Sequence, residues 1–110
     1  MSGPLEGLRV LDFTAMIAGP YCTRTLADLG AEVVKVEPPE GDYMRGREPL
    51  RQAADGSTPS AYFGGLNSGK PSVAIDLKTK EGRQLALDLA DKAGGVVENF
   101  RPGLRQRLGL

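Results

Sequence analysis

The feature that most constrains the fold is a strand–helix–strand pattern over residues 8–37. Residues 8–13 form a short apolar run typical of a buried strand, and residues 31–37 form a second one that two prolines end. Between them, Pro20 suits the first turn of a helix, and Gly30 suits a left-handed cap after its last turn. A strand, a helix and a strand within about 30 residues predict a βαβ unit with parallel pairing.

Apolar spacing predicts which helix faces are buried. In the first unit, Cys22, Leu26 and Leu29 fall at positions i, i+4 and i+7, so we expect them on the buried face. In the second half of the chain, Thr79 is a good N-cap for a helix that runs to about residue 93. Its predicted buried stripe contains leucines and alanines. The members of this stripe are Leu85, Ala86, Leu89, Ala90 and Ala93.

Residues 72–77 and 95–98 flank that second helix as alternating or β-branched runs, so the pattern repeats. The whole chain predicts an α/β fold, a Rossmann-like open parallel sheet built from two βαβ units. Residues 38–60 contain many prolines, glycines and charges, and we expect a long surface loop there. Ligands of such sheets bind beyond the carboxyl ends of the strands.

Composition excludes several kinds of chemistry. The chain has 14 basic and 14 acidic residues, which gives no reason to expect nucleic acid or a membrane surface as a partner. It has no histidine, so these residues hold no His-based triad, general base or metal ligand. A single cysteine makes a zinc site improbable, and we expect no metal and no catalytic residue in this chain. Without a secretory signal or a long apolar run, the cytoplasm is the expected location.

The stretch from Gly64 to Pro71 is close to a P-loop, with Gly69 and Lys70 after four intervening residues. A P-loop follows a strand, opens a helix and carries Ser or Thr after the lysine. Here the stretch precedes a strand, and Pro71 stands where the hydroxyl would be. We therefore expect no NTPase site. A plain connecting loop and a phosphate contact of another kind through Lys70 both stay open.

A dinucleotide site of the NAD type is disfavoured as well. Glu37 ends the second strand, where a ribose-binding acid would stand, but the turn after the first strand has Gly19 as its one glycine. Asp12 ends the first strand, and capping of that strand end is favoured over a functional role. After the fourth strand, Asn99 and Phe100 could bind and stack on a ligand, although a simple turn with Phe100 in the core is the alternative.

Four segments in order resemble the N-terminal region of the family III CoA-transferases, which include formyl-CoA transferase, carnitine CoA-transferase and α-methylacyl-CoA racemase. The segments read PLEGLRVLDFT followed by AGP, LADLGAEVVKVEPPEGDYMR, LNSGKPSVAIDLKTKEGR, and VVENFRPGLRQRLGL. Their order and spacing are more specific than any one of them alone. The resemblance implies that residues 1–110 are the incomplete N-terminal part of the larger CoA-binding domain.

In proteins of this family, CoA lies across the strand ends. The resemblance implies contacts from the first strand's turn, the loop before the third strand, and the segment after the fourth strand. The implied CoA-binding residues are Ile17, Ala18, Asn67, Lys70, Asn99, Phe100, Arg101 and Arg107. Some relatives carry arginine where this chain has Pro38, and Arg45 or Arg47 could take over that contact.

The implied function is CoA transfer from an acyl-CoA to a carboxylate acceptor through a covalent aspartyl intermediate. The family's nucleophilic aspartate lies downstream of the matched region, so this chain is expected to be an inactive fragment of a cytoplasmic enzyme that forms an interlocked homodimer. An acyl-CoA racemase of the same family is one alternative, and a non-catalytic CoA- or nucleotide-binding module is another.

Overall fold

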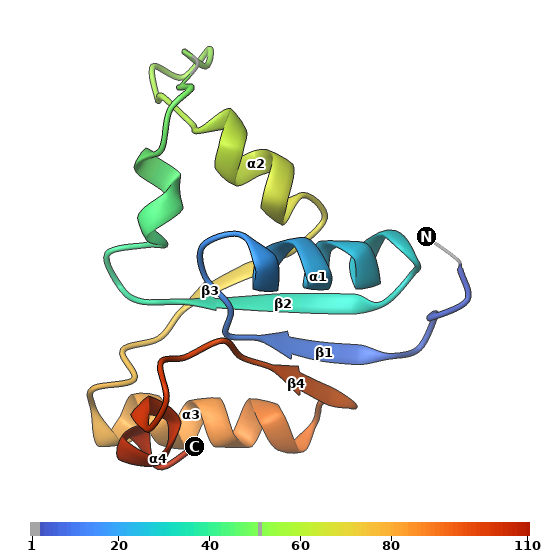
Figure 1. Cartoon of the computed structure of the whole chain (residues 1–110), viewed down its shortest axis with the longest axis vertical. Helices are drawn as coiled ribbons and strands as arrows, with labels where there is room; N and C mark the ends of the chain where they lie inside the picture. Colours follow the sequence, from blue (N-terminus) through green and yellow to red (C-terminus); the bar gives the residue numbers. More distant parts are fainter. Residues whose placement is uncertain (1–2, 51) are drawn as a thin grey trace.

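The computed structural model describes residues 3–50 and 52–110, which form a four-stranded sheet with parallel pairing throughout (Figure 1). The strands are β1 (Arg9–Asp12), β2 (Glu32–Glu37), β3 (Ser72–Ala74) and β4 (Gly95–Val97), in the spatial order β3-β2-β1-β4. These observations confirm the predicted α/β class and the open parallel sheet.

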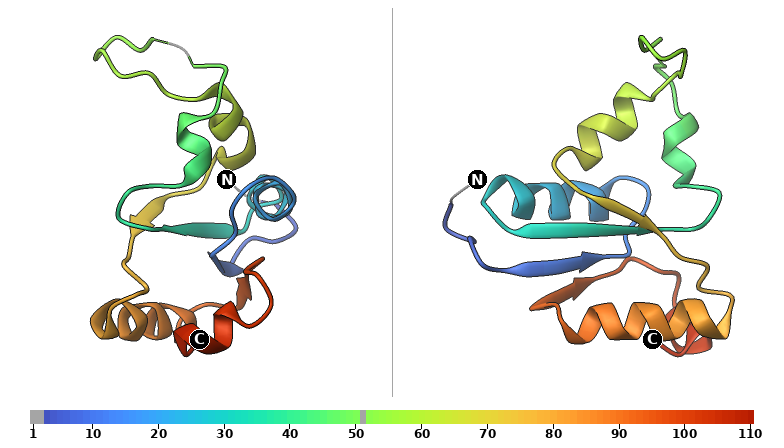
Figure 2. Two further views of the ribbon diagram at one scale, coloured as in Figure 1. Left: turned by 60° about the vertical axis from the view of Figure 1, so that its left-hand side comes forward. Right: turned by 180° about the vertical axis from the view of Figure 1, so that it is seen from behind.

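The helices are α1 (Ala18–Asp28), α2 (Ala61–Asn67), α3 (Lys80–Asp91) and α4 (Leu104–Leu108), with a 3-10 helix η1 (Tyr43–Gly46). Within the described ranges, none of them has the length and apolar character that a bilayer crossing requires. Helix α1 lies on one face of the sheet, and α3 lies on the other (Figures 1 and 2).

The second crossover differs from a simple repeat of the first. Helix α1 connects the neighbouring strands β1 and β2, whereas α3 connects β3 at one edge of the sheet to β4 at the other. From β1 the chain therefore adds β2 and then β3 on one side of β1, and afterwards places β4 on the other side of β1. The strand order reverses between β1 and β4, and ligands of open α/β sheets bind at such a reversal point.

Each face of the sheet buries its own apolar core. On the α1 face, Val10, Ala31 and Val33 are buried together with residues of α1 around them. On the α3 face, Leu11 and Val36 join a second cluster that extends to Ala86 of α3. Because both faces are covered, β1 reads as an apolar run in sequence, as expected for a central parallel strand.

The predicted buried face of α1 is partly wrong, because only Leu26 of its three residues packs against the core. Cys22 is exposed and Leu29 is 42% exposed, while Thr23 is fully buried. The reason is polar: the Thr23 hydroxyl donates a hydrogen bond of 2.7 Å to Asp12 Oδ2, which turns that side of the helix toward the sheet. Apolar spacing cannot reveal a helix face that a buried hydroxyl occupies. Gly30 has φ of 106°, which confirms the predicted left-handed cap.

Helix α3 begins as predicted, with Thr79 accepting a hydrogen bond of 3.0 Å from the Gly82 backbone N–H. Most of its predicted buried stripe is confirmed, because Ala86 is fully buried and Leu89, Ala90 and Ala93 pack against the core, whereas Leu85 is 48% exposed. Gly82 is also buried, and its α-carbon faces the carbonyl of Asp76. Gly82 therefore lets the first turn of α3 lie close to the connection from β3, which contains Asp76.

The stretch expected to be a glycine-rich loop is partly helical. Gly64 and Gly65 lie within α2, which starts at the N-cap Ser60, whose hydroxyl accepts from the Phe63 N–H at 3.1 Å. Residues 38–60 also contain η1. Tertiary contact explains the helix better than local propensity does, since α2 packs on α1 and the Arg24 guanidinium donates to the Gly65 carbonyl.

Arg45 folds the segment after β2 back onto the sheet. Its guanidinium donates to both carboxylate oxygens of Glu37, at 2.6 and 2.7 Å, and lies 4.2 Å from the ring centre of Phe63. The Ser72 hydroxyl and the Asp42 N–H also donate to the Glu37 carboxylate. Hydrogen bonding by Arg45, opposed by burial, lowers the pKa of Glu37 to about 2. Arg45 is thus paired with Glu37 although its own side chain is half-exposed.

We expect Gly82→Ala to destabilise the fold by at least about 2 kcal/mol, because a Cβ there would lie 1.9 Å from the Asp76 carbonyl oxygen. Gly64→Ala is the matched control, since a Cβ at that helical position meets no atom within 4 Å. It should be neutral or stabilise by up to about 1 kcal/mol. Thermal or urea unfolding measures the stabilities of both variants, and equal values would contradict the close approach of α3 to the Asp76 carbonyl.

We expect Arg45→Met to lower the free energy of unfolding by about 2 kcal/mol at pH 7, because it leaves the buried Glu37 carboxylate without its main partner. The folded pKa of about 2 lies below the ordinary value of 4.5, so the pair stabilises fully above pH 4.5 and its contribution fades toward pH 2. Urea unfolding from pH 7 to pH 2 should therefore show the variant and the unmodified protein converging.

Arg47→Met is the control for that series, because the Arg47 guanidinium forms no ion pair with another described residue. Its effect should stay within about 0.5 kcal/mol at every pH. A pH-independent loss in Arg45→Met would contradict the assignment to the Glu37 pair.

Candidate functional site

A cavity of about 610 Å³ lies at the carboxyl ends of the strands. Its walls come from the segments that follow each of the four strands and from α4, so it occupies the edge where the strand order reverses. The lining is largely apolar. Its apolar side chains include Phe13, Val36, Ile75, Leu77, Phe100 and Leu108. Several of these belong to the core on the α3 face, so the cavity opens directly from that core.

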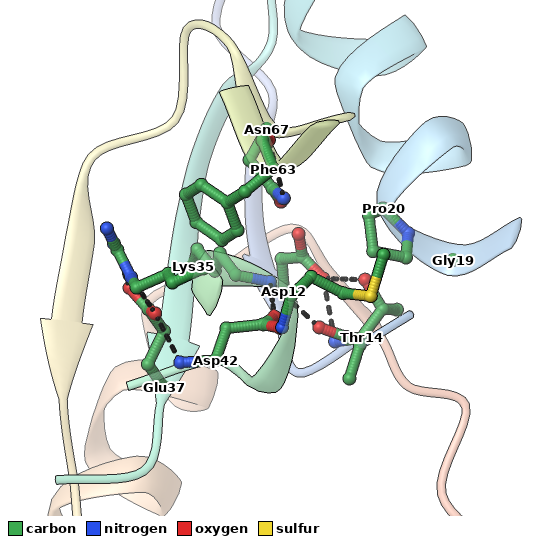
Figure 3. A network of polar contacts seen from close by, with 12 residues as sticks. Asp12, Thr14, Gly19, Pro20, Lys35, Glu37, Asp42, Phe63 and Asn67 are labelled. Atoms are coloured by element: carbon green, nitrogen blue, oxygen red, sulfur yellow. Dashed lines mark hydrogen bonds and ion pairs between the residues drawn. The ribbon is translucent and has the colours of Figure 1, made fainter. Parts of the chain in front are cut away.

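A buried network of charges lies beside this edge, on the α1 face (Figure 3). Its centre is Asp12, the last residue of β1, whose side chain has no exposed surface. Its Oδ1 accepts from the Thr14 N–H at 2.8 Å and from the Thr14 hydroxyl at 2.5 Å. Its Oδ2 accepts from Thr23 at 2.7 Å and lies 3.0 Å from the ammonium of Lys70. The favoured interpretation of Asp12 as a strand-end cap is confirmed.

The pKa of the Asp12 carboxyl is set by opposing effects. Burial alone would raise it, but hydrogen bonds from Thr14 and Thr23 and the contact with Lys70 together lower it below its usual value. The carboxylate is therefore charged at neutral pH.

Lys70 uses all three donors of its ammonium inside the protein. Its Nζ lies 3.0 Å from Asp12 Oδ2, 2.8 Å from Asn67 Oδ1 and 3.1 Å from the Pro20 carbonyl. The side chain has no exposed surface. An ammonium has only three protons to donate. For Lys70 to contact a ligand phosphate, it would have to release at least one of these three partners.

A second buried ion pair lies next to the first one. Lys35 stands opposite Asp12 in the β1–β2 register, and its side chain is 1% exposed. The Lys35 ammonium lies 2.9 Å from Asp42 Oδ2 and donates to the Thr14 carbonyl at 3.0 Å. Asp42 in turn accepts from the Met44 N–H, which fixes η1 at the edge of the network. Lys35 therefore connects the turn after β1 with the segment after β2.

Asn99 ties the turn after β1 to the end of β4. Its Oδ1 accepts from the Ala15 N–H at 3.0 Å, and its Nδ2 donates to the Ala15 carbonyl at 2.8 Å. This reciprocal pair spans the point where the strand order reverses. Gly19 lies against the same contact, because a Cβ at that position would be 2.4 Å from Thr14 Cβ and 3.0 Å from Asn99 Nδ2.

Polar contacts thus hold Thr14 and Ala15, and the next residue adopts an unusual backbone conformation. Met16 has φ of 71°, a left-handed value that non-glycine residues seldom adopt. Strain of this kind persists where the surrounding contacts determine the backbone. Ile17 follows as the N-cap of α1, without a side-chain cap, and is 48% exposed. The start of α1 therefore faces the outside of the protein.

The structure brings most of the predicted binding residues to one edge of the sheet. These are Ile17, Ala18, Asn67, Lys70, Asn99 and Phe100. Phe100 lines the cavity and packs on Phe13, with ring centres 5.9 Å apart, which confirms the core interpretation, and its stacking on a ligand stays a prediction. Arg101 and Arg107 are exposed, before and within α4.

Sequence reasoning missed part of the network, namely Thr14, Thr23, Lys35 and Asp42. One signal was present: a lysine in the middle of the strand sequence EVVKVE is unusual for a strand covered on both faces. No group of three or more His, Cys, Asp or Glu side chains suited to a metal ion occurs in residues 3–50 and 52–110.

Comparison with known proteins identifies the family. The model of CoA-transferase family III matches residues 5–110. A succinyl-CoA:mesaconate CoA-transferase from Haloarcula hispanica is 48% identical over 105 residues, which are 96% of this chain and 26% of that relative. A formyl-CoA:oxalate CoA-transferase from Streptomyces avermitilis is 44% identical over 110 residues, covering 100% of this chain and 26% of the relative.

Solved structures agree with this result. A CAIB/BAIF family protein from Brucella suis superposes with a TM-score of 0.92 at 42% identity, over 100% of this chain and 29% of that one. The chain thus spans about a quarter of the length of the relatives it matches. The resemblance seen in the sequence motifs is confirmed, and the chain belongs to CoA-transferase family III.

Proposed function

We propose that the protein carrying this chain transfers CoA from an acyl-CoA donor to a carboxylate acceptor, and that residues 1–110 supply part of its CoA site. Family membership over residues 5–110 supports this proposal. The observation that carries the location of the site is the apolar cavity at the carboxyl edge, at the reversal of strand order. An apolar cavity beside cationic side chains suits the adenine and phosphates of a nucleotide-bearing thioester.

Each part of the edge has a proposed role. Phe100 offers an aromatic face inside the cavity, and the exposed Arg101 and Arg107 offer bidentate donors for phosphate oxygens. Ile17 and Ala18 begin a helix without a side-chain cap, whose backbone N–H groups are available to a ligand. Asn67 accepts from the Lys70 ammonium and Asn99 binds the β1–α1 turn, so both shape the edge around the ligand.

The chemical step belongs to a residue outside this chain. In the proposed reaction, a downstream aspartate forms the covalent intermediate, and these residues bind and orient the CoA. The homodimer, the cytoplasmic location and the assignment of residues 1–110 to one larger domain stay predictions.

We expect Tyr43→Glu to weaken CoA binding by about tenfold or more, because Tyr43 lines the cavity and a carboxylate there would repel the phosphates of CoA. Tyr43→Gln is the matched control, because glutamine has the size of glutamate without its charge. This variant should bind CoA substantially more tightly than Tyr43→Glu. Tyr43 is 73% exposed, so neither change disturbs the core. Isothermal titration of the full-length variants with CoA, at low and high salt, measures the two affinities.

Acyl exchange tests the reaction itself. The full-length protein is incubated with an acyl-CoA and an isotopically labelled carboxylate, and label entering the thioester pool indicates transfer. A protein that binds no CoA would refute the proposed site. Equal affinity of the two Tyr43 variants would place the phosphates elsewhere.

A further inference from the structure

Three side chains hold the turn between β1 and α1: the buried Asp12 and Lys35, and Asn99. Thr14 is held at its N–H and its hydroxyl by Asp12, and at its carbonyl by Lys35. Ala15 is held at both backbone groups by Asn99. Every backbone polar group from Thr14 to Ala15 therefore has a side chain as its partner.

Lys70 closes this arrangement from the other side. Its ammonium joins three segments that are distant in sequence: the end of β1 through Asp12, the first turn of α1 through the Pro20 carbonyl, and the end of α2 through Asn67. Thr23 adds a second connection between α1 and Asp12. The distance between β1 and the first turn of α1 is thus fixed by one carboxylate and one ammonium, both fully buried.

We propose that the buried Asp12–Lys70 pair is a positioning device: Lys70 acts on the ligand through Asp12 and the β1–α1 turn, and does not itself contact a phosphate. This inference rests on the proposed CoA site. It changes the role of Lys70 from a phosphate-binding cation to the counter-ion that keeps Asp12 charged and in place. The strained Met16 then follows from contacts that fix the residues before it and the helix after it.

The energetics favour this role. Removing one partner of a buried ion pair leaves an uncompensated charge, which is strongly unfavourable. If Lys70 exchanged Asp12 for a phosphate, the buried Asp12 carboxylate would keep only its hydrogen bonds from Thr14 and Thr23. A carboxylate next to a bound phosphate would also repel it. Both effects oppose an exchange of Asp12 for a phosphate and favour the pair as observed.

Asp12→Asn distinguishes the two roles by the sign of its effect. The asparagine retains an oxygen that can accept from the Thr14 N–H, so the side chain keeps its size and its main capping bond. If the pair positions the turn, CoA affinity should fall by about tenfold, although the change removes a negative charge near an anionic ligand. If Lys70 binds phosphate directly, removal of its competing carboxylate should leave the affinity unchanged or increase it.

Asp28→Asn is the matched control, because this substitution makes the same change in net charge. Asp28 lies at the end of α1 in an exposed pair with Arg24. Its CoA affinity should equal that of the unmodified protein. Titrations use the full-length protein well below the thermal unfolding midpoint of each variant, so that loss of folded protein does not count as loss of binding.

A double-mutant cycle is completed by Lys70→Met and by the double variant Asp12→Asn/Lys70→Met. These variants also keep the test decisive if one single variant does not fold. The double variant retains a neutral, capped β1 end, so it should bind CoA more tightly than Lys70→Met alone. Equal affinities of these two variants would indicate a direct phosphate contact and overturn the inference. Unchanged affinity in every variant would reduce the pair to a stabilising role and would also overturn it.

Failure of the underlying function has a different signature. If the unmodified protein does not bind CoA, the proposed site is refuted, and the inference fails with it. If the unmodified protein binds CoA and Asp12→Asn binds it equally well or better, the site stands and only the positioning role is refuted.

Discussion

The structure depends on the carboxylate of Asp12, which is charged and fully buried at the end of β1. A charge in that place is tolerated only when several donors surround it, and Thr14, Thr23 and Lys70 meet this requirement. To do so they must come from the β1–α1 turn, from α1 and from the segment before β3. One electrostatic requirement therefore fixes the relative positions of three elements that define the candidate site.

The carboxyl edge of the sheet is divided into two parts with different chemistry. On the α1 face, the side chains of β2 are Val33, Lys35 and Glu37 in order. The two charged ones are paired with Asp42 and Arg45 and lie beneath η1 and α2. On the α3 face, the same edge opens into an apolar cavity. The paired polar side shapes the turn, and the open side offers room for a ligand. This division fits a site in which most buried cations support the structure.

Much of the fold could be predicted from the sequence, because the strands and the cap of α3 follow from local patterns. Thr79 capped α3 as expected, and Gly30 adopted the expected left-handed conformation. The predictions that failed concern helix faces and α2. Leu85 is exposed and Thr23 is buried, because which face packs depends on small residues and buried polar contacts that apolar spacing does not reveal.

By itself, the sequence determined the parallel α/β class, the family and the segments that meet at the carboxyl edge, since these follow from strand patterns and from motifs in a fixed order. Only the tertiary structure decided what the charged residues do. Lys70, Asp12 and Lys35 are far apart along the chain, and their pairing depends on the strand register and on how α1 and α2 pack. A sequence lists ionisable groups, but burial and distance select their partners.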